Sequence, residues 1–341
     1  MTLSSIGSGS PPPVLSLLVR GAITEAAHRG DVAVVGEGGV LVGSLGNPDR
    51  LVSLRSAVKP FTAVALLAAA AERGIEIAEE FVALAAASHA GSPEHVAVAQ
   101  AAIAQHGLDP GLLVHGRPAS QRGDAGVDLL SHMCSGQHLS LLLLAQAMGV
   151  DGRGYDAYDH PVQLRLREVV GELLSCDLSA APWGVDGCAI PTSAVPLRAT
   201  AEGARRWANP TDDAVPHKYQ PHLARVKAAA IAHPRLIAGG GFLDTDLIRG
   251  GAGEVVAKQG AEGLCLVGAP GLGIAVRTED GDAAARAGRV ATCAALAAMG
   301  VAVAGSAALS HHRIVRLPDP RGGEPLAEVR PSEAFEILRA R

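Results

Sequence analysis

The hydrophobic positions at both ends of the chain follow the spacing of β-strands. Residues 14–45 divide into four short apolar segments separated by glycines, a pattern typical of an antiparallel meander. Apolar segments of strand length return at 254–260, 263–270 and 272–280, and an alanine-rich stretch from about 282 to 299 predicts a helix after them. Both ends are therefore expected to supply strands to one antiparallel sheet.

The middle of the chain has helical spacing and clear helix boundaries instead. Ser92-Pro93 is typical of a helix start and Gly107 of its end. Further helices are predicted at 136–148, 161–175 and 220–232. This part of the chain should therefore form a large helical region.

Together these patterns predict an α/β (α+β) fold, with an antiparallel sheet built from both termini, flanked by helices, and a large helical region inserted. We expect one catalytic unit over residues 1–341, with a sheet subdomain of 14–55 plus 236–341 and a mainly helical subdomain of 56–235. The glycine-rich segments 239–241 and 268–273 lack the context of a phosphate loop and predict turns.

The composition narrows the class of partner. With 341 residues, of which 48% are hydrophobic, the chain can bury a full core. A net charge of -5 and an aromatic content of 3% provide neither the basic surface nor the stacking platforms of a nucleic-acid-binding protein. We therefore expect a small-molecule partner and no nucleic acid.

The apolar segments and the cysteines indicate in which cellular compartment the protein is expected. The N-terminal residues lack a basic segment followed by an apolar one, and no apolar run reaches the roughly 18 to 20 residues of a membrane span. We expect a cytoplasmic protein that does not contact membranes. The cysteines are odd in number and are predicted to be free thiols: Cys134, Cys176, Cys188, Cys265 and Cys293.

Lysine is scarce in this chain. It occurs four times, at Lys59, Lys218, Lys227 and Lys258, and the other 25 basic residues are arginine. Arginine keeps its proton near neutral pH, whereas a desolvated lysine can lose it. Lys59 and Lys258 are therefore candidates for proton transfer.

Ser56 and Lys59 lie three residues apart in the sequence LRSAVKPF. Pro60 is tolerated only near the start of a helix, so both residues should occupy the first, 3₁₀-like turn. A lysine in reach of a serine hydroxyl can remove its proton and make it a nucleophile. The alternative is a helix-capping serine beside a solvated lysine, because the S-x-x-K pattern is common.

Two later segments extend this pattern. Ser88 lies where a predicted helix breaks at Ser-His-Ala-Gly, which suits either a hydroxyl in a cleft or a simple C-terminal cap. Lys258-Gln-Gly260 lies on a predicted strand after the helical region. The order S-x-x-K, serine, K-x-G is similar to that of the serine penicillin-recognising enzymes.

Six longer segments carry a more specific pattern, and they are, in chain order, VRGAITEAAHRGDVAVVGEGG, LRSAVKPF, ASHAGSPEHV, MCSGQH, GVDGCAIPT and AKQGAEG. In sequence and order they resemble one family, the bacterial type II L-asparaginases related to the inducible rhizobial enzyme. The resemblance implies a fold like that of serine β-lactamases and penicillin-binding proteins, and hydrolysis of L-asparagine to aspartate and ammonia.

The same resemblance implies roles for individual residues. Ser56 matches the nucleophile and Lys59 its base partner, whereas Ser88 and Lys258 match a second Ser–Lys pair. Ser88 is the candidate acid for the leaving ammonia, with a proton relayed by either lysine. The division of roles between the two pairs stays open.

Substrate-binding residues follow from the resemblance as well. Asp186 matches a position near the substrate and could pair with its α-ammonium group, although a turn aspartate before Gly187 is the alternative. The backbone amides of Ser56 and Ala261 are candidate oxyanion donors. His138 completes the expected substrate-binding set.

The family's zinc site has only a partial match. Cys134 matches one ligand, but Gln137 replaces the family's lysine and residues 236–250 contain no second cysteine. Asp244 and His138 are conceivable substitutes. We expect that no cofactor is required and that any zinc binds weakly. The other histidines, including His89, His95, His132, His311 and His312, are expected to be capping or surface residues.

Two other functions remain open from the sequence. One is a different serine amidase, peptidase or β-lactamase-like hydrolase on the same scaffold, because a fold does not fix a substrate. The other is a non-catalytic protein that binds an amino acid at a decayed site. The resemblance also allows a homodimer.

Overall fold

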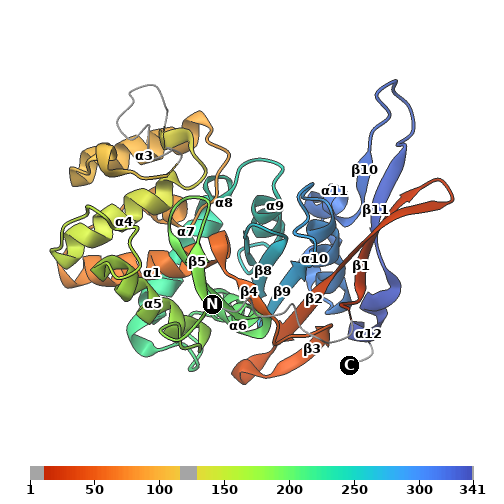
Figure 1. The fold of residues 1–341 in the computed structure, drawn as a ribbon, viewed down its shortest axis with the longest axis horizontal. Coiled ribbons are helices and arrows are strands. Elements are labelled where there is room, and N and C mark those ends of the chain that lie inside the picture. Colours follow the sequence, from red (N-terminus) through yellow and green to blue (C-terminus); the bar gives the residue numbers. More distant parts are fainter. Residues whose placement is uncertain (1–10, 116–128, 340–341) are drawn as a thin grey trace.

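The computed structural model describes residues 11–115 and 129–339, so most of the proline-rich leader lies outside the described residues. An eight-stranded antiparallel sheet occupies one half of the molecule (Figure 1), in the order β10-β11-β1-β2-β9-β8-β7, with β3 paired to β2. The N-terminal strands β1 and β2 thus lie between C-terminal strands in one sheet, which confirms this part of the predicted fold. The strands are β1 Val14–Arg20, β2 Ile23–Val35, β3 Leu41–Leu45, β7 Val256–Gln259, β8 Leu264–Ala269, β9 Leu272–Thr278, β10 Val315–Leu317 and β11 Ala327–Pro331.

Three features of the sheet differ from the sequence prediction. Residues 23–35 form one long strand rather than two, because Gly30 stays extended and pairs with Thr278. The edge strands β10 and β11 were not predicted. Nor was a small sheet in the order β4-β6-β5, whose strands are β4 Leu51–Ser53, β5 Trp183–Val185 and β6 Pro191–Pro196.

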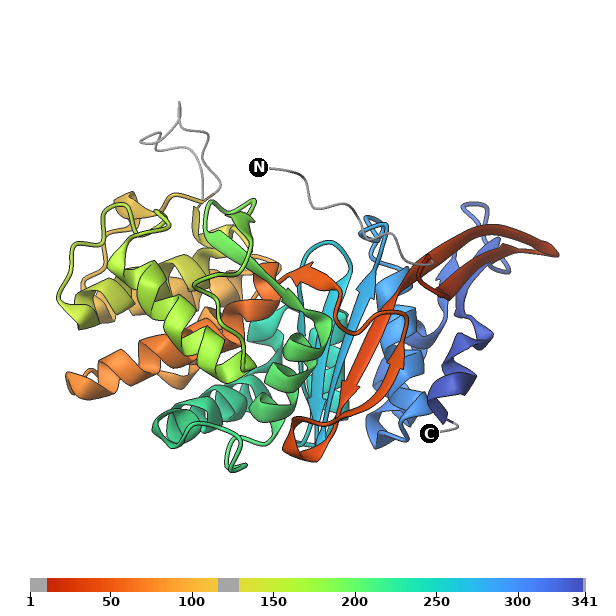
Figure 2. The same cartoon turned by 60° about the horizontal axis from the view of Figure 1, so that its bottom comes forward.

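Helices cover both faces of the large sheet (Figures 1 and 2). The helices predicted at four positions of the middle region are present, and Gly107 and Gly149 end two of them with left-handed backbones. The helix bounds are α1 Lys59–Glu72, α2 Glu79–Ala85, α3 Pro93–His106, α4 Ser135–Met148, α5 Pro161–Leu174, α6 Leu197–Ala208, α7 Gln220–Ala232, α8 Pro234–Ile237, α9 Leu243–Gly250, α10 Ala287–Ala298, α11 Ser310–Arg313 and α12 Glu336–Arg339.

Successive residues of the central strands contribute to two different cores. Val32 and Val34 pack with α9 and α10, whereas Ala33 and Val35 pack with α6 and the helical region. This follows from the two-residue period of a strand. Ala257 of β7 belongs to the first core, so its neighbour Lys258 is directed toward the helical region. Strand periodicity therefore places this lysine on the side where Ser56 lies.

The glycines around the β8–β9 turn allow α6 to lie directly on the sheet. A Cβ atom at Gly268 or Gly273 would clash with the carbonyl oxygens of Ala204 or Ala201 in α6. The turn between β8 and β9 lies within the predicted segment 268–273, whose outer residues are paired in the two strands, and Gly271 in the turn has a φ of 68°. Its flanking glycines additionally serve close packing between helix and sheet.

The predicted helix at 282–299 begins five residues late, at Ala287. Asp282 stays outside the helix because its carboxylate accepts hydrogen bonds from the amides of Arg286 and Gly288. Such local bonds compete with helix formation.

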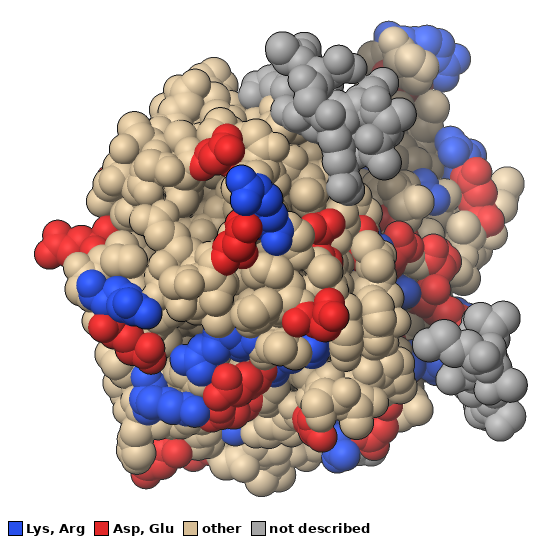
Figure 3. All heavy atoms as spheres, turned by 60° about the vertical axis from the view of Figure 1, so that its left-hand side comes forward, with Lys and Arg blue, Asp and Glu red and all other residues tan. Residues whose placement is uncertain are grey.

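Within residues 11–115 and 129–339, no helix is long and apolar enough to span a membrane. On the face shown in Figure 3, lysine and arginine are interspersed with aspartate and glutamate. That face offers no basic stripe for a phosphate backbone.

Candidate active site

Ser56 lies in a tight turn that leads into the first helix of the helical region. Residues Arg55–Val58 form a 3₁₀ turn, and α1 begins at Lys59 with Pro60 in its first turn. Proline costs no hydrogen bond there. The position predicted for Ser56 and Lys59, a 3₁₀-like helix start, is therefore confirmed.

The ammonium group of Lys59 is buried and has three neighbours. Its Nζ donates to Ala87 O at 2.8 Å and to Ser88 Oγ at 3.1 Å, and it lies 3.2 Å from Cys134 Sγ. An ammonium would make all three contacts as donor, and a neutral amine would make them by accepting a hydrogen bond from Ser88 or Cys134. Lys59 is only 1% exposed, which contradicts the alternative of a solvated lysine.

Ser88 contacts Lys59 directly, whereas Ser56 Oγ has no hydrogen bond to any described residue. The chain after α2 is irregular at Ser88, as predicted, and Ser88 N donates to Ile237 O at 2.9 Å. Catalytic hydrogen bonds often form fully only when substrate is bound. The half-buried, unpaired Ser56 hydroxyl is thus available to a ligand.

Lys258 is the second fully buried lysine. Its Nζ donates to Gln259 O at 2.6 Å and lies 3.5 Å from Asp244 Oδ2. Burial lowers the pKa of Lys258, the nearby Lys59 lowers it further, and Asp244 opposes both. Asp244 is fixed in turn by the amide of Gln259 at 3.0 Å. Asp244 therefore serves this lysine and is not beside Cys134.

A second thiol lies beside Cys134, and it comes from Cys188. The turn after β5 is closed by Asp186 N, which donates to Ile190 O at 2.8 Å, and it brings Cys188 to Cys134. A hydrogen bond from the Cys188 thiol, together with Lys59, lowers the pKa of Cys134. The same contact raises the pKa of Cys188. A second cysteine ligand was expected at 236–250, which contain no cysteine, and Cys188 was not predicted.

Asp186 is part of an ion pair next to Ser56. Arg55 Nε donates to Asp186 Oδ2 at 2.7 Å, and Arg55 Nη1 lies 3.9 Å from Glu262 Oε1. The pKa of Arg55 is raised by its hydrogen bond to Asp186. Both side chains keep some exposure, at 25% and 12%. Arg55 carried no signal in the sequence beyond its position before Ser56.

The backbone of the K-x-G segment lies against the Ser56 turn. A Cβ atom on Gly260 would lie 3.2 Å from Leu54 O and 3.3 Å from Ala57. This close approach places Ala261, the next residue, near Ser56. Neither the Ser56 amide nor the Ala261 amide donates a hydrogen bond to another described residue. Two free donors therefore flank the serine.

His138 lies deeper, on α4. Its Nδ1 lies 2.5 Å from the hydroxyl of Tyr155, and its ring packs on His115. Burial lowers the pKa of His138 well below its ordinary value. This is a buried imidazole held by Tyr155.

The remaining histidines divide into two groups. His95 caps α3 through Ser92, as predicted for a capping residue. The prediction is wrong for His89 and His312, which are buried and bond to Ser135 and Asp246. Their partners are distant in sequence, so no local pattern could reveal them.

A family model that matches most of the chain identifies an amidohydrolase. The model is that of L-asparaginase II and matches residues 17–331, so the chain belongs to the L-asparaginase II family. The resemblance noted in the sequence is therefore confirmed. No curated protein matches the chain.

Proposed function

We propose that the protein hydrolyses L-asparagine to L-aspartate and ammonia, with Ser56 as nucleophile. The observation that carries this proposal is the L-asparaginase II match over residues 17–331. We further propose that the fold is of the serine β-lactamase type, since strands of both termini form one sheet and the helical region is inserted between them. A homodimer and a cytoplasmic location stay predictions.

The proposed reaction has two acyl-transfer steps. Ser56 Oγ attacks the side-chain amide carbon of asparagine and gives its proton to neutral Lys59. The departing nitrogen takes up a proton through Ser88, which lies 3.1 Å from Lys59 Nζ, and leaves as ammonia. Water then cleaves the Ser56 ester and releases aspartate.

The second lysine helps to keep this centre able to exchange protons. Burial lowers the pKa of Lys258, which makes its neutral form more accessible. Cys134 Sγ, whose pKa is lowered, accepts a hydrogen bond from Lys59 Nζ at 3.2 Å and so holds this lysine in place. The Ser88–Lys258 pair expected from the resemblance has no direct hydrogen bond among the described residues, so we propose that Ser88 acts through Lys59.

The negative charge on the attacked amide oxygen also needs donors. The amides of Ser56 and Ala261 are the proposed donors, and two observations support this: neither has a partner among the described residues, and Gly260 packs against the Ser56 turn. Preorganised backbone donors of this kind stabilise a tetrahedral intermediate strongly.

Recognition of a free amino acid requires charges of both signs. Asp186 would bind the α-ammonium group of asparagine, and Arg55, its partner at 2.7 Å, would bind the α-carboxylate. A zwitterionic substrate can replace the existing ion pair without leaving either charge unpaired. This favours a free amino acid over a peptide or a β-lactam.

The residues near Cys134 do not fit the family's zinc ion. A tetrahedral site needs three or four donors. Cys134 and Cys188 supply two thiols, and His132 hydrogen-bonds to Cys134, but within the described residues no third histidine, cysteine, aspartate or glutamate has a ligand atom within 4.8 Å of both thiols. Gln137 stands where the family has a lysine. We therefore derive no step through a metal.

Ser56→Ala tests the proposal. It should lower ammonia release from L-asparagine at least 10³-fold, because the nucleophile is lost, while the circular dichroism spectrum stays unchanged. Ser53→Ala, an exposed serine three residues earlier on β4, is the matched control and should keep full activity. Full turnover by folded Ser56→Ala would contradict the assignment.

The substrate is tested separately with a panel of amides. Ammonia release from asparagine, glutamine and a dipeptide amide, and acylation by a labelled penicillin, should be compared with metal-stripped and zinc-supplemented protein. We expect release from asparagine in both preparations. Acylation by penicillin without ammonia release would favour the β-lactamase-like alternative, and binding without turnover would favour the non-catalytic one.

A further inference from the structure

Asp246, His311 and His312 form a cluster on the opposite side of the sheet from Ser56. Asp246 is on α9, and the two histidines are on α11. α9 and α10 pack on the sheet face that includes Val32 and Val34, whereas α1 belongs to the other core. Figure 1 shows α9 and α11 on the same side as α10. Among the described residues, none of the three has a hydrogen bond or ion pair to Ser56, Lys59, Ser88 or Lys258, although Asp246 lies two residues after Asp244, the partner of Lys258.

The nitrogens of both imidazoles are directed at one carboxylate oxygen. His312 Nε2 lies 3.1 Å from Asp246 Oδ2, and His311 Nε2 lies 3.4 Å from the same atom. The three ligand atoms lie within 4.8 Å of one another. The His311 and His312 ring centroids are 3.9 Å apart. Two consecutive histidines of a short helix thus present nitrogens to the same point.

These separations match a metal coordination shell. In a tetrahedral zinc site, bonds of about 2.0–2.1 Å place neighbouring ligand atoms about 3.3–3.4 Å apart. The two histidine–aspartate distances lie close to that value. Imidazole nitrogen with one carboxylate is a donor set that suits zinc, copper, nickel and cobalt rather than magnesium or calcium.

Two of the three side chains in the cluster are buried and one is exposed, an arrangement that suits a metal site reached from solvent. His312 and Asp246 are buried, at 1% and 11% side-chain exposure, and are held in place by packing. His311 is 52% exposed, which gives an ion a path from solvent. Arg289 lies near His312 and acts against a bound cation, so the site should be of moderate strength.

We propose that Asp246, His311 and His312 bind one divalent transition metal ion of the zinc type, with water completing the coordination. The ion would join α9 to α11. Because α9 also carries Asp244, the partner of Lys258, a bound ion would fix the helix that supports the candidate active site. Its first measurable effect would be on stability.

The test uses the full chain, stripped of metal and titrated with Co²⁺ and Zn²⁺. Cobalt bound to nitrogen and oxygen gives visible d–d bands without a thiolate charge-transfer band, which separates this site from Cys134 and Cys188. We expect such bands, and a melting temperature that rises with added Zn²⁺. His311→Ala should weaken cobalt binding at least tenfold, and Asp246→Asn should do the same.

Control variants make the result decisive. His217→Ala removes an exposed histidine elsewhere and should leave the affinity unchanged. His311→Ala replaces an exposed side chain and should fold normally, so its effect is not one of unfolding. Absence of saturable cobalt bands, or bands of equal affinity in His311→Ala, would overturn the proposal and leave an Asp246–histidine hydrogen-bond cluster. Neither outcome depends on asparagine turnover.

Discussion

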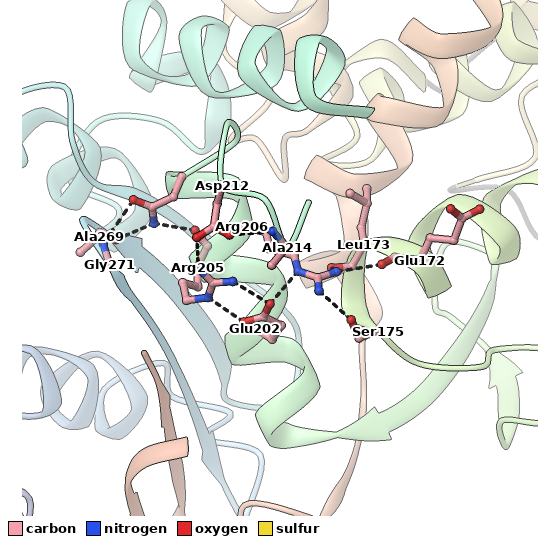
Figure 4. Close-up of polar contacts among 11 residues, drawn as sticks. Glu172, Leu173, Ser175, Glu202, Arg205, Arg206, Asp212, Ala214, Ala269 and Gly271 are labelled. Carbon is pink, nitrogen blue, oxygen red and sulfur yellow. Dashed lines mark hydrogen bonds and ion pairs between the residues drawn. The ribbon is translucent and has the colours of Figure 1, made fainter. Parts of the chain in front are cut away.

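Two buried charged clusters in this protein are built on opposite principles. On α6, Glu202 accepts hydrogen bonds from Arg205 and Arg206, and Arg205 also pairs with Asp212 at 2.5 Å (Figure 4). Arg206 uses its remaining donors on Glu172 O, Leu173 O and Ser175 Oγ. Two cations face two carboxylates, and the cluster is closed.

The candidate active site has two buried lysines and one buried carboxylate. Lys258 has Asp244, whereas Lys59 contacts a carbonyl, a hydroxyl and a thiol. Two protonated lysines and one ionised carboxylate leave an excess of one positive charge. This excess disappears only if one lysine loses its proton or the Cys134 thiol loses its own. Arginine on α6 cannot do so, but lysine and cysteine can.

The difference teaches how a structural charge cluster can be told from a reactive one. Both are buried, but the first is satisfied by groups that do not titrate near neutral pH. In the second cluster the charge balance depends on two groups with shifted pKa values, Cys134, lowered by a hydrogen bond from Cys188, and Lys258, lowered by burial, and such shifts are typical of catalytic sites. The comparison predicts that substitutions on α6 change stability and substitutions at Lys59 change activity.

Lys59→Arg gives the largest expected effect on activity. It keeps the charge and removes the ability to accept a proton, so kcat for ammonia release should fall about 10²–10⁴-fold. Lys227→Arg is the matched control, because Lys227 lies on α7 and its ammonium group donates, among the residues that the structure describes, to Ala208 O alone. A near-normal rate in Lys59→Arg would show that Lys59 is not the base.

Arg205→Met should have the opposite pattern of effects, with a loss of stability and no loss of activity. It leaves Glu202 and Asp212 without their shared partner in a buried site, which costs about 3–5 kcal/mol of unfolding free energy. Urea unfolding measures this loss, and kcat per folded molecule should be unchanged. A variant as stable as the parent would mean that the α6 cluster does not stabilise the fold.

The smallest expected effect is the contribution of Lys258 to the pH dependence of the unfolding free energy. Burial lowers the pKa of Lys258 below its ordinary 10.5, so between the two values the unfolded chain binds more protons than the folded one. Unfolding free energy should therefore rise with pH through this window, by at most about 1.4 kcal/mol per pH unit. The rise should be smaller in Lys258→Met. Identical pH curves for the two proteins would contradict a lowered pKa.

The sequence predicted the parts of this protein that depend on local patterns. The helix start at Lys59, the capped helix after Ser92 and the strands at both ends all followed from periodicity and boundary residues. It did not predict β5 and β6, which are short strands inside a helix-rich region. Strands of three to six residues carry too few positions for a periodic signal.

The candidate site was accessible from the sequence only in part. Motifs identified Ser56 and Lys59. The contact between Cys188 and Cys134, in contrast, joins residues more than 50 positions apart in the sequence and depends on how the turn after β5 packs. Likewise, the pairing of Arg55 with Asp186 and of Asp244 with Lys258 arises from tertiary packing. No spacing rule connects such residues, so only the fold could bring them together.

The central claim is that Ser56 carries the acyl group during turnover. Protein mixed with excess L-asparagine, quenched in acid within milliseconds and digested, should show an aspartyl ester by mass spectrometry on the peptide that contains Ser56. The Ser56→Ala variant should show none. An ester on Ser88, or full turnover with no ester on any serine, would contradict the account.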